Sequence, residues 1–463
     1  MRVRVPFGNR HLVGIAIGET DEQPDFVVKD INSVIDERRV WSDDIWQLIQ
    51  WSADYYHHSL GDVAANTLPV LLRKGAAAEY PATEYWQLTE AGREIAPEQL
   101  KRAPKQQQLL ELLATEAQPR SVITAANISS TVINAVVEKG WIEAQQRQPR
   151  ISTEPWRVVQ DNEPLTLNSQ QAVAVTTINQ QQGHAAMLLQ GITGSGKTEV
   201  YLQAITPVLQ RGQQVLVLVP EIGLTPQTLK RFQQRFDVPI VMLHSGLNDS
   251  ERLQAWLDSR SGQAAIIIGT RSAVFTPCKQ LGLIIIDEEH DLSFKQQDGF
   301  RYHARDVAIK RAQLLNIPIV MGTATPSLET LNNAVNQRFN WLKLEQRAGG
   351  AEQVKHQLLD LKGQKLEAGV SQPLREQMAT ELAKGNQVLL FLNRRGYAPA
   401  LMCHECGWIA QCQRCDAYYT VHKSLHQLHC HHCGSQRAIA KQCGDCGSLH
   451  LMTHGVGTEQ LEN

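Results

Sequence analysis

The stretch Gly191-Ile192-Thr193-Gly194-Ser195-Gly196-Lys197-Thr198 decides the fold of the nucleotide-binding part of this chain. It matches the glycine-rich pattern whose backbone N–H groups surround a β-phosphate, with a lysine for the β- and γ-phosphates and a hydroxyl for Mg²⁺. A short apolar run, Ala186 to Gln190, precedes it, and a helical pattern, Glu199 to Leu209, follows. The sequence therefore predicts a strand, a phosphate loop and a helix in that order.

A second motif follows about ninety residues later, where the apolar run Leu283 to Ile286 ends in Asp287-Glu288-Glu289-His290. We expect Asp287 to complete the Mg²⁺ site together with Thr198. Glu288 is then placed to orient and deprotonate an attacking water. With Lys197, these residues predict a site of ATP hydrolysis. Either motif alone occurs by chance in loops, but the pair in this order is much harder to dismiss.

Near-continuous apolar runs alternate with helical patterns through the same region. The expected strands are 186–190, 215–219, 240–243, 264–268, 283–287 and 317–321. This alternation is typical of an α/β protein with a doubly wound parallel sheet, which binds ligands at the carboxyl ends of its strands. Three distinctive loops follow such runs, at residues 220–225, 269–273 and 322–327.

Composition limits the class of protein. The 463 residues are 42% hydrophobic, and the net charge is −2, which does not by itself indicate a nucleic-acid binder. No stretch reaches the roughly 20 apolar residues that cross a bilayer, and the start of the chain lacks the apolar core of a signal peptide. We expect a cytoplasmic protein with no membrane contact.

Two smaller domains are expected before the nucleotide-binding region. Short β-like runs (3–5, 12–17 and 26–28) and a helical stretch, 41–56, predict a small α+β domain. Helical patterns at 105–113, 121–126 and 129–139, followed by an apolar strand near residue 142, suit a winged helix. A three-helix packing domain without a ligand explains the second pattern equally well.

Eight of the nine cysteines form four C-x-x-C pairs between residues 403 and 446. In a chain without an export signal, this pattern predicts two Zn²⁺ sites of four thiolates each. Ribbon-like spacing favours one site made by Cys412, Cys415, Cys430 and Cys433, with Cys403, Cys406, Cys443 and Cys446 closing an outer site. A cross-braced pairing stays open, and a structural role is expected because four thiolates leave no open coordination position.

The ordered motifs resemble those of superfamily 2 helicases, which have two RecA-like lobes. The resemblance narrows to the primosomal replication-restart helicases and covers essentially the whole chain. It rests on residues 191–201, 219–227, 244–247 and 287–290, and on the four cysteine pairs after the stretch 391–397. The resemblance implies ATP-dependent 3′ to 5′ unwinding, recognition of stalled or collapsed forks and initiation of primosome assembly for replication restart.

The resemblance also implies roles for single residues. Gln171 would read adenine, Arg271, Thr323 and Thr325 would contact DNA or couple hydrolysis to it, and Gly8 and Lys29 fall where a pocket for a 3′ DNA end has residues. The stretch after the acidic motif would be a DNA-sensing loop. In that loop, aromatic faces stack on bases and cations meet phosphates, which predicts contact by Phe294, Lys295, Phe300, Arg301, Tyr302 and Arg305.

The implied partners are branched and single-stranded DNA, single-strand binding protein and other primosome proteins, with a monomeric chain. The expected domains are an incomplete 3′-end binding domain (1–75), a winged helix (76–150), helicase lobe 1 (151–345), the start of lobe 2 (346–402), the zinc module (403–450) and lobe 2 resumed (451–463). We expect a chain that is shortened at both ends, lacks the arginine finger of lobe 2 and does not unwind DNA by itself.

Two other classes of protein share parts of this pattern. A P-loop ATPase that remodels protein complexes has the phosphate loop and the acidic motif, but no reason to carry the loop at 269–273 or the basic aromatic stretch. A zinc-dependent DNA-binding scaffold without catalysis would be indifferent to the loss of Glu288.

Overall fold

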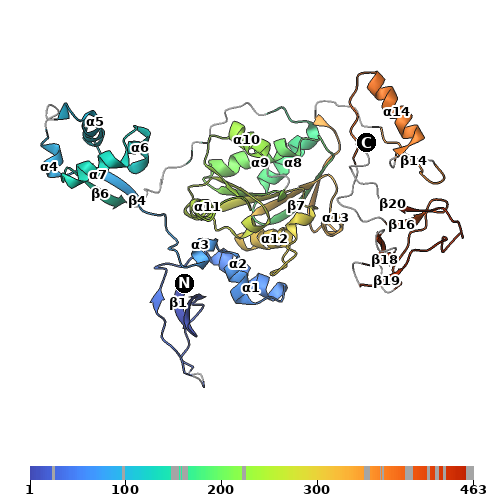
Figure 1. The fold of residues 1–463 in the computed structure, drawn as a ribbon, viewed down its shortest axis with the longest axis horizontal. Helices are drawn as coiled ribbons and strands as arrows, with labels where there is room; N and C mark the ends of the chain where they lie inside the picture. Colours follow the sequence, from blue (N-terminus) through green and yellow to red (C-terminus); the bar gives the residue numbers. More distant parts are fainter. Residues whose placement is uncertain are drawn as a thin grey trace. The chain divides into compact units, whose positions relative to one another are not determined.

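A computed structural model describes residues 1–22, 25, 27–95, 100–147, 156, 158, 165–221, 226–348, 355–364, 366–367, 370–391, 400–413, 418–422, 427–430 and 434–454. They belong to two compact units, Met1–Glu352 and Gln353–Asn463. Figure 1 traces the chain through both of them.

A seven-stranded sheet forms the centre of the first unit. Its strands lie in the order β13-β7-β12-β11-β8-β10-β9, and every neighbouring pair is parallel. The strands are β7 (Ala185–Gly191), β8 (Gln214–Leu218), β9 (Ile240–Leu243), β10 (Ile266–Gly269), β11 (Leu281–Asp287), β12 (Pro318–Thr323) and β13 (Asn340–Leu344). The predicted parallel sheet is confirmed, and β12 lies between β7 and β11, the two strands that carry the nucleotide motifs.

Helices cover both faces of this sheet, as expected for a doubly wound fold. They are α8 (Ser169–Gln180), α9 (Lys197–Gln210), α10 (Pro226–Arg235), α11 (Asp249–Ser261), α12 (Ala304–Leu315) and α13 (Leu328–Val335). One buried cluster joins α8, α9 and α10 to side chains such as Val215 and Ile285. A second joins α11 and α12 to the alternate residues, such as Leu216 and Ile284. Strands with two apolar faces therefore read as continuous apolar runs.

Local signals set the helix ends. Asn168 and Gln171 form a reciprocal capping box at the start of α8, and Asn248 and Glu251 do the same for α11. Each box satisfies two backbone N–H groups that the first turn of a helix leaves without partners. These caps fix where the helices begin at the edges of the sheet.

The amino-terminal part combines a small antiparallel sheet with three helices. The strands are β1 (Arg2–Phe7), β2 (Arg10–Ile15) and β3 (Ser33–Val34), and the helices are α1 (Asp43–Tyr55), α2 (Leu60–Asn66) and α3 (Val70–Arg73). The expected strand at 26–28 is wrong for its described residues, because Val27 and Val28 lie outside the strands with 91% and 66% of their surface exposed. Phe26 lies outside the described residues.

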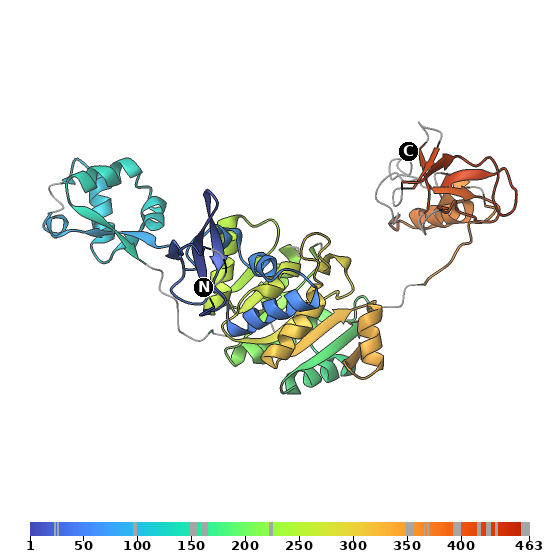
Figure 2. The ribbon, with the colours of Figure 1, turned by 90° about the horizontal axis from the view of Figure 1, so that it is seen from below.

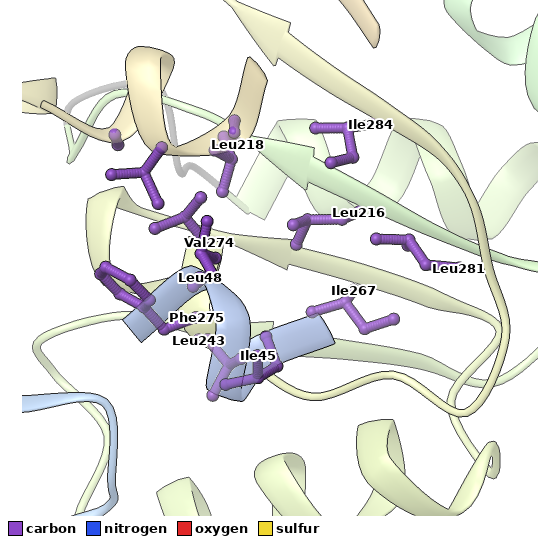
Figure 3. Packing of buried hydrophobic residues seen from close by; sticks show 14 of the residues in the cluster. Ile45, Leu48, Leu216, Leu218, Leu243, Ile267, Val274, Phe275, Leu281 and Ile284 are labelled. Atoms are coloured by element: carbon purple, nitrogen blue, oxygen red, sulfur yellow. The ribbon is translucent and has the colours of Figure 1, made fainter. Parts of the chain in front are cut away.

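Helix α1 packs on the nucleotide-binding lobe. Ile45 and Leu48 lie in the same buried cluster as Leu216 and Ile267 of the sheet (Figure 3). The α1 carboxylate of Asp44 lies 3.5 Å from the guanidinium of Arg311 in α12, whose side chain is completely buried. The amino-terminal helices therefore complete one face of the lobe, and the view in Figure 2 shows α1 lying along it.

The winged-helix prediction is confirmed by four helices around a small three-stranded sheet in the described residues between 83 and 147. The sheet has the order β5-β4-β6. Its elements are β4 (Thr83–Leu88), α4 (Glu90–Arg93), α5 (Pro104–Leu113), β5 (Gln118–Pro119), α6 (Arg120–Ala125), α7 (Ser130–Glu138) and β6 (Ile142–Arg147). A separate buried cluster that includes Leu109, Ile123 and Val136 holds them together.

In its described residues, the second unit contains one helix and two antiparallel sheets. A short hairpin of β14 (Leu366–Glu367) and β15 (Val370–Ser371) leads into α14 (Gln372–Ala383). The larger sheet has the order β19-β18-β17-β16-β20, and the described cysteines between 403 and 446 lie in its strands or in the segments that connect them. Its strands are β16 (Ala400–Cys403), β17 (Thr420–His422), β18 (Gln427–His429), β19 (Gln436–Ala438) and β20 (Leu451–His454). Among the helices that the structure describes, none is both long and apolar enough to span a bilayer.

Candidate nucleotide site and zinc centre

The phosphate loop connects the end of β7 to the start of α9. Gly194 and Gly196 both have φ of +81°, a left-handed conformation that favours glycine. A Cβ atom on Gly196 would lie 2.4 Å from Nε2 of Gln171, so this position also needs glycine for space. The first N–H groups of α9 have no partners in their own helix, which suits them to bind phosphate oxygens.

A pocket of about 840 Å³ lies beside the loop. Nζ of Lys197 donates a 3.0 Å hydrogen bond to the carbonyl of Gly191 and lies 3.6 Å from Oε1 of Glu288. The side chain of Lys197 is 11% exposed and that of Glu288 is 39% exposed. The structure therefore brings Lys197, Asp287 and Glu288 to one pocket. The residues that line it are Leu165, 192–199, Leu202, Arg231, Gln234, Arg235, Asp287 and Glu288.

Asp287 is the last residue of β11 and is largely buried. Its Oδ1 accepts a 3.0 Å hydrogen bond from the hydroxyl of Tyr201. Burial raises the pKa of the Asp287 carboxyl, and the negative charge of Glu288 raises it further. Burial also raises the pKa of Tyr201 well above that of a free tyrosine, so its hydroxyl is the donor. A carboxylate oxygen and the Thr198 hydroxyl in one pocket fit the oxygen ligands that Mg²⁺ prefers.

Glu288 adopts a left-handed backbone conformation with φ of +50°. Such a conformation costs a residue other than glycine about 1 to 3 kcal/mol and persists only where its surroundings hold it. The turn places the Glu288 carboxylate between Lys197 and the ring of His290, whose Nδ1 lies 3.6 Å from Oε2. The strain is thus located at the residue that the sequence assigns to water activation.

Gln171 is 4% exposed and both ends of its amide contact protein. Nε2 donates to the carbonyl of Ser195 at 2.8 Å, and Oε1 accepts from the backbone N–H of Asn168 at 2.9 Å. Gln171 lies in α8, so its hydrogen bond to Ser195 connects this helix to the phosphate loop. Its predicted contact with adenine stays a prediction.

Glu289 connects the acidic motif to the loop after β12. Its completely buried carboxylate accepts from Nη1 of Arg305 at 3.1 Å, from the backbone N–H of Ser327 at 2.8 Å and from the hydroxyl of Thr330 at 2.9 Å. Beside it, Nδ1 of His290 lies 2.7 Å from the hydroxyl oxygen of Thr323. The motif that ends β11 is therefore bonded directly to the loop for which the family resemblance implies a role in DNA coupling.

The aromatic side chains of the predicted DNA-sensing loop are buried, which corrects the expectation that they stack on bases. Phe294 is completely buried, and Phe300 and Tyr302 are 3% and 6% exposed. Their partners come from distant parts of the chain, because Phe300 contacts Tyr56 and His58, and Tyr302 contacts Phe275. The rings hold the loop to the core.

The basic residues of the same loop divide into two groups. Arg305 is 7% exposed and bonded to Glu289, so it is structural rather than available to phosphate. Arg301 is exposed and Lys295 is partly exposed. Arg271 holds the loop in place, because its Nη1 donates hydrogen bonds to the carbonyls of Ser293 and Lys295 at 2.8 and 3.2 Å. Only part of the predicted set therefore faces solvent.

The other residues assigned to DNA lie on separate elements. Gly8, with φ of +58°, is in the exposed turn between β1 and β2, and Lys29 is exposed before β3. Thr323 is completely buried, whereas Thr325 is exposed and its N–H donates to the Thr323 hydroxyl at 3.0 Å.

The structure gathers the four outer cysteines into one cluster. The Sγ atoms of Cys403, Cys406, Cys443 and Cys446 all lie within 4.8 Å of one another. Sγ of Cys403 is 3.6 Å from that of Cys446, and Sγ of Cys406 is 3.6 Å from that of Cys443. A tetrahedral site with Zn–S bonds of about 2.3 Å requires sulfur separations of about 3.8 Å, so the cluster fits Zn²⁺.

The inner set is described only in part. Cys412 and Cys430 are buried together near Tyr419 and Leu428. Cys415 and Cys433 lie outside the described residues. The outer set agrees with the nested arrangement expected from the sequence, while the second Zn²⁺ stays a prediction.

Four family models match parts of the chain. They are a DEAD/DEAH box helicase (168–334), a 3′ DNA-binding domain (1–69), a winged helix like that of primosomal protein N′ (83–144) and the Cys-rich region of the PriA DNA helicase (412–437). The replication restart protein PriA of Haemophilus influenzae is 49% identical over the whole chain, which covers 64% of that relative. The chain belongs to the PriA family.

Further comparisons give additional matches. The replication restart protein PriA of Bacillus subtilis is 37% identical over 78% of the chain, which covers 46% of that relative. The chain thus spans about half to two thirds of the length of these PriA relatives. The Hef helicase domain of Pyrococcus furiosus matches 39% of the chain and 38% of its own length at 19% identity, with a TM-score of 0.30.

Three residues in the lining of the nucleotide pocket or directly behind it had no role in the motifs read from the sequence. Tyr201 bonds to Asp287, and Arg235 of α10 pairs with Glu199 of α9. Tyr201 lies four residues after Lys197, and residues at this spacing are neighbours on one face of a helix. This spacing was the only local signal that Tyr201 lies near the site. The pairing of Glu199 with Arg235 joins separate elements and has no local signal.

Proposed function

We propose that this chain provides the ATP-binding and DNA-engaging parts of a DNA helicase that moves 3′ to 5′, recognises stalled or collapsed replication forks and starts primosome assembly for replication restart. The observation that carries the proposal is the meeting of Lys197, Asp287 and Glu288 at one pocket beside the phosphate loop. Membership of the PriA family and the match to a DEAD/DEAH box helicase support it.

Each residue of the pocket has a step in the proposed hydrolysis. Lys197 binds the β- and γ-phosphates, and the N–H groups of residues 193–198 bind the phosphate oxygens. Thr198 and Asp287 hold Mg²⁺, which when bound neutralises the charge that develops on the phosphates. Glu288 accepts a hydrogen bond from the attacking water and takes its proton. The 3.6 Å separation of Lys197 and Glu288 keeps the phosphate and the water site adjacent.

The bonds around the acidic motif support a route from hydrolysis to DNA. The Glu288 carboxylate contacts His290, and His290 contacts the hydroxyl of Thr323. That hydroxyl accepts a hydrogen bond from the N–H of exposed Thr325, so a movement of Glu288 would be transmitted along these contacts. We propose Thr325, Lys295 and Arg301 as contacts to the phosphates of single-stranded DNA. Gly8 and Lys29 are proposed for the 3′ end, in line with the 3′ DNA-binding domain model over residues 1–69.

The remaining assignments belong to the same proposal. Two structural Zn²⁺ ions stabilise the second unit, and the whole protein works in the cytoplasm as a monomer with single-strand binding protein and other primosome proteins. The proposed domains are those expected from the sequence, although α1 packs on the helicase lobe.

Nucleotide binding by residues 1–463 tests the proposal. A fluorescent ATP analogue with Mg²⁺ should bind the chain, and Lys197→Ala should weaken binding by at least about tenfold because it removes a charge-assisted contact to phosphate. Lys230→Ala changes an exposed lysine of α10 and should have no effect. Equal binding by both variants would overturn the proposal. Stimulation of the intact relative's ATPase by single-stranded DNA, rather than by protein, separates a helicase from a protein-remodelling ATPase.

A further inference from the structure

Tyr201 joins the helix of the phosphate loop to the end of β11. It lies on α9 one turn after Lys197, is 2% exposed and belongs to the buried cluster on that face of the sheet. Its hydroxyl donates a 3.0 Å hydrogen bond to Oδ1 of Asp287. A tyrosine ring buried among apolar side chains thus presents its only polar atom to the carboxylate that lines the pocket.

The strand between the two motifs is shaped around the same hydroxyl. A Cβ atom on Gly322 of β12 would lie 1.5 Å from the hydroxyl oxygen of Tyr201. The φ of Gly322 is not in the left-handed region, so backbone conformation does not require glycine there. The carbonyl of Gly322 also accepts a 3.1 Å hydrogen bond from the N–H of Glu289. Glycine at 322 therefore makes room for the hydroxyl between the ends of β11 and β12.

This contact restricts the carboxylate of Asp287. A hydrogen bond to one oxygen disfavours rotation of the carboxylate, and the buried ring holds the donor in place. Removal of one group that orients a metal ligand in this way usually lowers the metal affinity by tenfold to hundredfold. We propose that Tyr201 is a positioning residue that orients Asp287 toward the Mg²⁺ of a bound nucleotide. The inference rests on the proposed ATP-binding function.

The test uses Tyr201→Phe in residues 1–463, because phenylalanine keeps the buried ring and removes only the hydroxyl. A fluorescent ATP analogue is titrated in EDTA and then at increasing Mg²⁺ concentrations. In EDTA, we expect the affinity of the variant for the analogue to stay within twofold of that of the unaltered chain. Added Mg²⁺ should increase this affinity, and the Mg²⁺ concentration that gives half of the increase should be about tenfold higher in the variant. Gly322→Ala, which displaces the hydroxyl, should raise that concentration as well.

Tyr80→Phe is the matched control, since it removes a tyrosine hydroxyl that lies 2.9 Å from the carboxylate of Asp258 away from the pocket. It should not change the Mg²⁺ response. The pair Tyr201→Phe and Asp287→Asn should respond to Mg²⁺ as Asp287→Asn alone does, because the hydroxyl acts through that carboxylate.

Two results would overturn the inference. One is an unchanged Mg²⁺ response in Tyr201→Phe, and the other is an equal loss of binding with and without Mg²⁺, which would indicate a general packing role. Failure of the proposed function would be recognised from the unaltered chain itself. That chain would then show no nucleotide binding that is lost in Lys197→Ala.

Discussion

The guanidinium of Arg305 lies 3.1 Å from the carboxylate of Glu289, and that carboxylate is completely buried. The pair fastens the acidic motif to the start of α12, and Ser327 adds a bond from the loop after β12. Buried charge of this kind is tolerated because it is paired and hydrogen-bonded.

Loss of Arg305 should therefore destabilise the first unit. Arg305→Ala leaves the Glu289 carboxylate without its cation in a dry site, and we expect the free energy of unfolding to fall by about 3 to 5 kcal/mol. Arg301→Ala removes an exposed arginine of the same loop and should change it by less than about 0.5 kcal/mol. Urea unfolding of the two variants checks the difference. Equal stabilities would contradict the structural role of the pair.

Glu288→Gln should separate nucleotide binding from hydrolysis. The amide keeps the size of the side chain but cannot take a proton from water, so ATP hydrolysis by an intact relative carrying this change should fall by at least about a hundredfold. Binding of the Mg²⁺–ATP analogue should be retained. A non-catalytic scaffold would show no change in either measurement.

The raised pKa of Asp287 predicts a pH dependence of Mg²⁺-assisted nucleotide binding. Burial and Glu288 raise this pKa, so the carboxyl takes up a proton at a higher pH than an ordinary aspartate does. Binding that needs the ionised form is complete above the raised pKa and is lost as the pH falls through it. Titrations with Mg²⁺ between about pH 8 and pH 5 should show the loss, and Asp287→Asn should flatten the profile. A loss confined to the pH range of an exposed carboxylate would contradict this prediction.

Changes in the loop after the acidic motif should distinguish its exposed cations from its buried rings. Arg301→Ala removes a charge available to a phosphate, and we expect the salt dependence of single-stranded DNA binding to drop by about one counterion. Phe294→Ala should instead lower the free energy of unfolding by about 3 to 5 kcal/mol, because it leaves a cavity in the core. A selective loss of DNA binding in a stable Phe294→Ala protein would restore the stacking interpretation.

Zinc content should follow the nested arrangement of the cysteines. We expect two Zn²⁺ per chain by elemental analysis. Cys403→Ser should lose the outer ion alone, whereas Cys412→Ser should lose the inner ion alone. Because bound Zn²⁺ contributes folding energy directly, chelation should unfold the cysteine-bearing sheet and leave the first unit intact. The paired variant Cys403→Ser and Cys443→Ser should still keep one ion, because both residues belong to the outer set. Loss of both ions from that paired variant would favour the cross-braced alternative.

The sequence predicted the central sheet and the nucleotide motifs well because their signals are local. All six expected runs coincide with strands of the sheet to within a few residues, and Gly194 and Gly196 of the phosphate loop adopt a backbone conformation that favours glycine. The edge strand β13, with its alternating Asn-Trp-Leu-Lys-Leu, was missed, because a short strand with one covered face gives a weak signal.

Other features depend on contacts between distant residues and could not be predicted. An aromatic stretch beside basic residues is compatible with a surface that stacks on bases and also with rings that pack in the core. The partners Tyr56, His58 and Phe275 decide that question. Tyr56 and His58 lie more than 240 residues before Phe300, and Phe275 lies in the short helix after β10. In the same way, the spacing of the cysteines allowed several pairings, and only the positions of the sulfur atoms select the outer set.

The insertion of Ile45 and Leu48 into the core of the lobe has a consequence for how the protein can be dissected. A shortened protein that starts after the first three helices would carry bare aliphatic side chains on its sheet and would self-associate. The segment that a family model describes as DNA-binding and the lobe that holds the phosphate loop should therefore melt in a single cooperative transition. Neither can be studied as an autonomous fragment.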